Sequence, residues 1–117
     1  FSHLRIIQNS IEGKELEQII NISSDMGSIS LNKEGDYYYY RTSKTLLNSI
    51  TKNISIDLKQ RNISAYCIHP GSVKTKLNSG GLISPKIAAQ KIINLCAENN
   101  SKFNGKFIDI NKNILEW

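Results

Sequence analysis

The arrangement of apolar residues along the chain is the feature that most restricts its fold. Residues 18–23 and 63–68 are short and almost continuously apolar, as is typical of strands covered on both faces of a parallel sheet. Between them, residues 37–60 have the period of an amphipathic helix. Its apolar positions are Leu46, Leu47, Ile50, Ile54 and Leu58. The pattern predicts two parallel strands joined by a crossover helix.

The same alternation continues on both sides of this unit. Residues 2–13 have apolar side chains at helical spacing and end at Gly13, which indicates the back half of a helix. Ser84 and Pro85 are a cap and a first-turn proline for a helix, and residues 106–110 predict a third strand. The expected inner face of that helix carries Ile87, Ala88, Ile92 and Leu95. The order predicts an α/β fold in which three parallel strands alternate with helices.

Length and composition limit the class of protein. A chain of 117 residues with 39% hydrophobic content can bury one core, so we expect one domain. No apolar run approaches the ~20 residues of a membrane span and no signal segment is visible, which predicts a cytoplasmic protein without a membrane partner. Cys67 and Cys96 form no CxxC pair, so we expect buried thiols and no metal site. The charge of +5 is scattered, which argues against nucleic-acid binding.

Polar residues that suit catalysis gather at one predicted edge of the sheet. Ser23 and Ser24 end the first strand, and His69, Pro70 and Gly71 end the second. In sheets of this kind, ligands bind beyond the carboxyl ends of the strands. The helix that connects the two strands begins near Tyr40, so its first turns are expected at the same edge.

Tyr40 and Lys44 are four residues apart at the start of that helix. At 3.6 residues per turn, their side chains project from the same face. A phenol is a weak acid, but an ammonium about 5 Å away favours the phenolate by roughly 3 kcal/mol at an effective dielectric constant near 20. The pair can therefore act as a general acid and base near neutral pH, although the pattern alone more often marks a solvated helix start.

Three strings in this order resemble the short-chain dehydrogenase/reductase family. They are NISSDMGS at residues 21–28, YRTSK at residues 40–44 and HPGSVKTKL at residues 69–77. They match the serine-bearing strand end, the YxxxK pair and the PGxVxT loop of the family. The connection GGLISP at residues 80–85 and the ending GKFIDINKNILEW are most similar to the C-signal and sniffer-type carbonyl reductases. The resemblance implies the second half of a Rossmann-like, doubly wound parallel sheet.

The resemblance also implies roles for individual residues. Ser24 would bind the substrate carbonyl, Tyr40 would transfer the proton, and Lys44 would stabilise the phenolate and bind the nicotinamide ribose. Ser23 and Ser28 are the alternatives to Ser24. Tyr37, Tyr38 and Tyr39 are expected to line the cleft or pack at the helix entry, and His69 and Asp25 to have structural or solvated roles.

The resemblance implies an oxidoreductase that transfers hydride between NADP or NAD and a small carbonyl or alcohol substrate. Tyr40 and Lys44 would contact the cofactor, and so would residues of the PGxVxT loop: Pro70, Gly71, Ser72, Val73 and Thr75. The discriminating residues for NAD or NADP lie in the first half of a family member, so both cofactors remain open.

The sequence departs from the family where the family binds the cofactor pyrophosphate. It contains no glycine-rich TGxxxGxG turn, which binds the pyrophosphate at a helix N-terminus in the family. Residues 1–117 are therefore expected to form one partial NAD(P)-binding domain that is weak or inactive alone. The alternative is a non-catalytic association module. In either case the resemblance implies a homo-oligomer formed through helices at residues 2–13 and 37–60.

Overall fold

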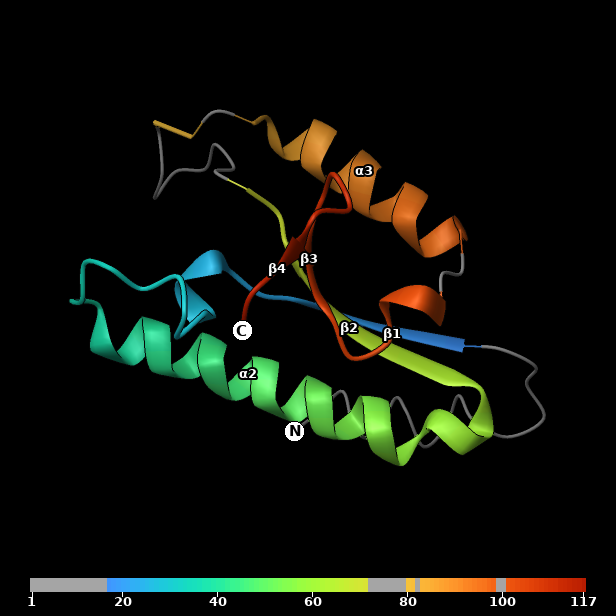
Figure 1. The fold of residues 1–117 in the computed structure, drawn as a ribbon. Coiled ribbons are helices and arrows are strands. Elements are labelled where there is room, and N and C mark those ends of the chain that lie inside the picture. Colours follow the sequence, from blue (N-terminus) through green and yellow to red (C-terminus); the bar gives the residue numbers. More distant parts are fainter. Residues whose placement is uncertain (1–16, 72–79, 82, 99–100) are drawn as a thin grey trace.

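The computed structural model describes residues 17–71, 80–81, 83–98 and 101–117 (Figure 1). They form one four-stranded sheet in the order β1-β2-β3-β4, between helix α2 on one face and helix α3 on the other. The elements are β1 (Glu17–Ile22), α2 (Tyr38–Asp57), β2 (Ile63–His69), α3 (Pro85–Glu98), β3 (Phe107–Asp109) and β4 (Ile114–Leu115). The helix predicted at residues 2–13 lies outside the described residues.

The strand pairing confirms the predicted α/β class. β1 pairs with β2 in parallel, with Ile19 opposite Ala65, and β2 pairs with β3 in parallel, with Ile68 opposite Ile108. β4 is antiparallel to β3 and was not predicted. The chain reverses before it in a tight turn, where the Asp109 carboxylate accepts hydrogen bonds from backbone N–H groups of residues 111 and 113.

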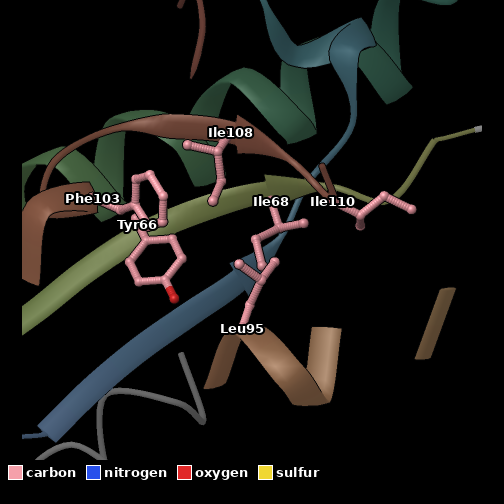
Figure 2. Packing of buried hydrophobic residues seen from close by; sticks show 6 residues of the cluster. All are labelled: Tyr66, Ile68, Leu95, Phe103, Ile108 and Ile110. Carbon is pink, nitrogen blue, oxygen red and sulfur yellow. The ribbon is translucent and has the colours of Figure 1, made fainter. Parts of the chain in front are cut away.

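The α3 face of the sheet carries a continuous apolar core (Figure 2). Leu95 of α3 packs among side chains from the strands and from a short 3-10 helix at Ser101–Phe103. The members are Tyr66, Ile68, Leu95, Phe103, Ile108 and Ile110. Ala88 and Leu95 of α3 are buried as predicted, but Ile87 is 54% exposed, so that part of the prediction is wrong. Ile87 directly precedes Ala88, and consecutive helical residues point about 100° apart.

The α2 face of the same sheet is partly polar. Ile54 and Ala65 form a small apolar cluster with Ile19, Ile50 and Leu58 at its edge. Nearer the carboxyl ends of the strands, the interface with α2 instead buries polar side chains: Ser23, Asn48 and Thr51. Cys67 is buried here, whereas Cys96 on α3 is exposed, contrary to the expectation of two buried thiols. The two faces thus differ in chemistry as well as in their covering helix.

None of the helices among the described residues is both long enough and apolar enough to span a membrane.

Candidate active site

Tyr40 and Lys44 lie on the side of α2 that faces the end of β1. The Lys44 ammonium is 5.7 Å from the centroid of the Tyr40 ring, and it donates a 3.4 Å hydrogen bond to the carbonyl oxygen of Ile22. Tyr40 is 46% exposed and Lys44 is half-buried. The structure therefore brings phenol and ammonium together at the strand edge, in the geometry that their spacing predicted.

The serines form the turn that follows β1. Ser24 caps a one-turn 3-10 helix, η1 (Asp25–Gly27), because its Oγ accepts a hydrogen bond from the N–H of Met26 at 3.1 Å. Its hydroxyl also donates to Asp25 Oδ1 at 3.3 Å. Ser24 is 8% exposed. The side chain thus lies just beneath the surface, with its hydroxyl hydrogen in a long bond to a carboxylate.

The two alternative serines have shorter hydrogen bonds to the protein. The Ser23 hydroxyl donates to Asn48 Oδ1 at 2.6 Å. The Ser28 hydroxyl lies 2.6 Å from the carbonyl oxygen of Glu116 and 2.9 Å from that of Trp117. Both side chains are at most 3% exposed. A substrate oxygen would have to break a short buried bond at either serine, but only a long one at Ser24.

Gly27 allows this turn to pack directly against α2. A Cβ atom at this position would lie 2.8 Å from Lys44 Cβ and 2.9 Å from the Lys44 carbonyl carbon. The Gly27 carbonyl also accepts a 2.8 Å hydrogen bond from the Thr45 hydroxyl. The absence of a side chain at Gly27 therefore sets how closely the serine turn approaches the Tyr40–Lys44 helix.

His69 connects the end of β2 to the serine turn. Its Nδ1 accepts a 3.1 Å hydrogen bond from the Asp25 backbone N–H, and its Nε2 lies 3.8 Å from Asp25 Oδ2. This is the structural position that the sequence suggested for His69. Pro70 and Gly71 follow, and Gly71 has a left-handed φ of 82°. Ser72, Val73 and Thr75 of the predicted cofactor loop lie outside the described residues.

A cleft of about 870 Å³ opens beside Tyr40. Its walls combine apolar and charged side chains: Asp25, Met26, Leu31, Lys33, Glu34, Tyr37, Tyr40 and Arg41. Ser24 and Lys44 are not among these lining residues. Tyr37 lines the cleft as expected, whereas Tyr38 faces a second groove and Tyr39 is 95% exposed.

The entry to α2 has an unusual backbone that the sequence did not predict. Gly35, Asp36 and Tyr37 have consecutive left-handed φ angles of 72°, 63° and 51°. Such angles are strained for non-glycine residues. Arg41 holds the segment, because its Nε donates to the carbonyl oxygens of Gly35 at 3.0 Å and Asp36 at 3.1 Å. Three left-handed residues in succession turn the chain so that Tyr37 lies against the cleft.

Comparison with known proteins identifies the family. A sequence model of the short chain dehydrogenase family matches residues 3–81. The chain belongs to this family. It is 27% identical to the C-signal protein of Myxococcus xanthus over 87% of this chain and 62% of that protein. It is 30% identical to 1-hydroxy-2-glutathionyl-2-methyl-3-butene dehydrogenase of Rhodococcus over 82% of this chain and 45% of that protein.

Solved structures support the same assignment. The carbonyl reductase Sniffer of Drosophila melanogaster superposes with a TM-score of 0.86 at 33% identity, over 97% of this chain and 49% of that chain. An NADPH-bound carbonyl reductase from chicken fatty liver gives a TM-score of 0.69 at 30% identity, over 86% of this chain and 42% of that chain. The chain spans about half the length of these short chain dehydrogenases.

One further titratable group, the Cys67 thiol, lies near the candidate site. Burial raises the pKa of this thiol to about 11, although a hydrogen bond with Thr51 and the charge of Lys44 oppose the shift. The thiol is therefore protonated at neutral pH and is no nucleophile there. Across the described part of the chain, the structure brings together no group of His, Cys, Asp or Glu side chains that could hold a metal ion.

The C-terminal residues also contact the serine turn. Besides the Ser28 bonds, the Ile29 N–H donates to the Trp117 carbonyl oxygen at 2.6 Å. The Trp117 ring stacks on Phe107 of β3, with ring centroids 5.5 Å apart and planes at 19°. Sequence reasoning missed this contact, because nothing in the pattern links Ser28 to a residue 89 positions later.

Proposed function

We propose that these residues form the proton-transfer half of an oxidoreductase that interconverts a carbonyl and an alcohol with NADP(H) or NAD(H). The observation that carries the proposal is the Tyr40–Lys44 pair on α2, whose ammonium bonds the carbonyl of Ile22 at the strand end, two residues before Ser24. Membership of the short chain dehydrogenase family supports it. So do the carbonyl reductase names of the Sniffer and chicken proteins, the latter with NADPH bound.

Each of the three residues has a distinct part in the proposed reaction. The Ser24 hydroxyl turns from Asp25 to donate a hydrogen bond to the substrate carbonyl oxygen. Tyr40, whose ring reaches the cleft, gives its proton to that oxygen during reduction and removes it during oxidation. Lys44 stabilises the phenolate that remains, because opposite charges attract strongly in a partly desolvated site.

The residues present fit the nicotinamide end of the cofactor. An ammonium has three N–H donors, and the bond to Ile22 uses one, so Lys44 can also donate to ribose hydroxyls. Pro70 and Gly71 lie at the adjacent strand end, where Gly71 has a left-handed φ of 82° and an added Cβ would lie 2.8 Å from Ile83 Cδ1. When bound, the nicotinamide supplies or accepts the hydride. Tyr40, Lys44, Pro70, Gly71, Ser72, Val73 and Thr75 are the proposed contacts.

The sharpest test compares two neighbouring tyrosines. In the native polypeptide that contains these residues, Tyr40→Phe should lower kcat for a carbonyl substrate by roughly 10²–10⁴-fold, because the general acid is lost. Tyr39→Phe makes the same chemical change on a side chain that is 95% exposed and should leave kcat unchanged. The measurement is NADPH or NADH oxidation with a panel of small aldehydes and ketones. Equal kcat values for the two variants would refute the assignment of Tyr40.

We also propose that the 117 residues alone are a poor enzyme, because the pyrophosphate-binding turn of the family is not in this sequence. Fusion of the amino-terminal half of the fruit-fly Sniffer reductase ahead of Phe1 should restore cofactor binding, which fluorescence titration with NADPH would measure. Strong NADPH binding by the 117 residues without the fusion would contradict this proposal.

One observation favours a second candidate, a module for self-association. The outer side of α2 exposes Tyr38, Leu46 and Ile56, and a groove of about 520 Å³ lies between α2 and Ile29. Paired helices at residues 2–13 and 37–60 would cover this side in a homo-oligomer. Analytical ultracentrifugation with a cofactor titration separates the two functions: a pure association module dimerises without binding nucleotide, and Leu46→Glu should make it monomeric.

A further inference from the structure

The end of β1 is joined to α2 by a hydrogen bond that the proposed reaction does not use. The Ser23 hydroxyl donates to Asn48 Oδ1 at 2.6 Å, and both residues are 3% exposed. Ser23 directly precedes Ser24, and Asn48 lies one helical turn after Lys44. Tyr40, Lys44 and Asn48 therefore share one side of α2, at intervals of four residues. The bond thus joins the two elements that carry the proposed catalytic groups.

A buried polar pair of this kind adds little net stability to the contact between two elements. A hydrogen bond between neutral groups contributes only about 1 kcal/mol net, whereas a buried polar atom without a partner costs about 1–3 kcal/mol. Asn48 Nδ2 is such an atom, because it is buried and has no hydrogen-bond partner among the described residues. Apolar side chains fill the corresponding interface on the α3 face. Stability alone therefore does not explain Ser23 and Asn48.

Unlike apolar packing, the Ser23–Asn48 bond fixes the position of α2 along β1. Apolar contacts tolerate small sliding of a helix along a strand, but a 2.6 Å hydrogen bond is directional and weakens steeply with displacement. A displacement of about 1 Å between reacting groups can cost about 10²-fold in rate. The bond joins Ser23, next to Ser24, to Asn48, one turn after Lys44. Sliding of α2 at this point would therefore move Tyr40 away from Ser24.

We propose that Ser23 and Asn48 are a positioning pair, which holds α2 against β1 so that Ser24 and Tyr40 reach the same substrate oxygen. The inference rests on the proposed function of Ser24, Tyr40 and Lys44. Neither Ser23 nor Asn48 touches the substrate. Their contribution is to kcat, through alignment, and not to the binding of the cofactor.

The test separates alignment from stability by a double substitution. Ser23→Ala leaves the Asn48 amide oxygen without its partner, so it should lower both the melting temperature and kcat. Adding Asn48→Leu removes the remaining buried polar atoms, so Ser23→Ala/Asn48→Leu should regain melting temperature. Its kcat should stay about 10–100-fold below that of the unsubstituted protein, with the KM for cofactor changed less than about threefold.

The experiment uses the native polypeptide that contains these residues, at a temperature where circular dichroism shows every variant to be folded. The matched control is Ser55→Ala on the same helix, a serine that is 2% exposed and whose hydroxyl bonds the Lys52 carbonyl within α2. It removes a buried hydroxyl without removing a contact to β1, so it should lower the melting temperature and leave kcat unchanged.

The outcomes distinguish failure of the positioning role from failure of the proposed function. A double variant whose kcat returns with its melting temperature would show that the pair is only structural, as would single variants with normal kcat. If Ser55→Ala lowers kcat as much as Ser23→Ala, alignment by the pair is also refuted. An unsubstituted polypeptide that turns over no carbonyl with either nicotinamide cofactor would refute the proposed function itself, and the positioning role with it.

Discussion

The two faces of the sheet are each covered by one helix, but they are built from different side chains. On the α3 face, Leu95 packs among aromatic and branched apolar residues (Figure 2). On the α2 face, the part nearest the strand ends buries Thr51 and also Ser23 and Asn48, which are joined by a hydrogen bond. Asn21 Nδ2 donates to Thr51 Oγ1 at 2.8 Å in the same interface.

The difference separates two tasks within a small fold. Burial of apolar area supplies most folding free energy and tolerates exchange among side chains of similar volume. Hydrogen bonds between buried polar groups add little net stability but restrict geometry. The α3 face thus supports the fold, and the role that we propose for the α2 face is to orient Ser24, Tyr40 and Lys44.

The comparison predicts that the largest effect on stability comes from the α3 face. Leu95→Ala should lower the free energy of unfolding by about 2–5 kcal/mol, because it leaves a cavity in the apolar core. Ile87→Ala on the same helix, at a position 54% exposed, should change it by less than about 1 kcal/mol. Urea denaturation measures both. Similar losses would mean that the core boundary on α3 is misplaced.

An intermediate effect on stability is expected on the α2 face, because the serine turn packs against α2 with no room for an added side chain. Gly27→Ala places a Cβ atom 2.8 Å from Lys44 Cβ and 2.9 Å from the Lys44 carbonyl carbon. The clash should lower the free energy of unfolding by about 1–3 kcal/mol, and it should also lower kcat by displacing the serine turn. Gly80→Ala is the matched control, since apart from its chain neighbours no atom of the described residues lies within 4 Å of the added Cβ. Thermal melts and kinetics of the pair test this, and full activity of Gly27→Ala would contradict it.

The smallest effect on stability is expected from the hydroxyl of Tyr66, the polar end of a side chain in the apolar core. Tyr66 donates a 3.1 Å hydrogen bond to Gln18 Oε1, and burial, followed by the charges of Cys96 and Glu98, raises the pKa of its hydroxyl to about 12. The unfolded phenol ionises near pH 10, so the unfolded state loses its proton first and stability should fall as pH rises from about 10 to 12.

Tyr66→Phe isolates this contribution. Below pH 9 the variant should lose only about 1 kcal/mol with the hydrogen bond. Between pH 10 and 12 its stability should decline less steeply than that of the unsubstituted protein, because one ionising group is gone. Parallel urea midpoints across this range measure the difference, and curves of equal slope would show that Tyr66 does not contribute.

Sequence periodicity predicted the strands and helices well because each is long or continuously apolar. β1, α2, β2, α3 and β3 all lie within a few residues of their expected bounds. β4 has only two residues, too few for a detectable period. Residues 59 and 60, expected in α2, belong to a 3-10 turn at residues 59–61, because the left-handed Asn62 ends the helical path before β2.

The site was predictable to the extent that it depends on local spacing. Tyr40 and Lys44 meet because one helix sets their distance, whatever the rest of the chain does. The Ser23–Asn48 bond and the contact of Ser28 with the C-terminal carbonyls join residues 25 and more positions apart. Such contacts depend on how elements pack, and no local pattern in the sequence encodes them.

The stacking of Trp117 on Phe107 has a practical consequence. Trp117 is the single tryptophan of the sequence, and its carbonyl oxygen accepts the N–H of Ile29 beside the serine turn. Indole emission depends on the polarity around the ring, so fluorescence excited at the tryptophan band would come from one known place in the fold. The protein therefore carries an intrinsic optical probe of the contact between Trp117, Phe107 and the residues after the serine turn, and no label is needed to follow it.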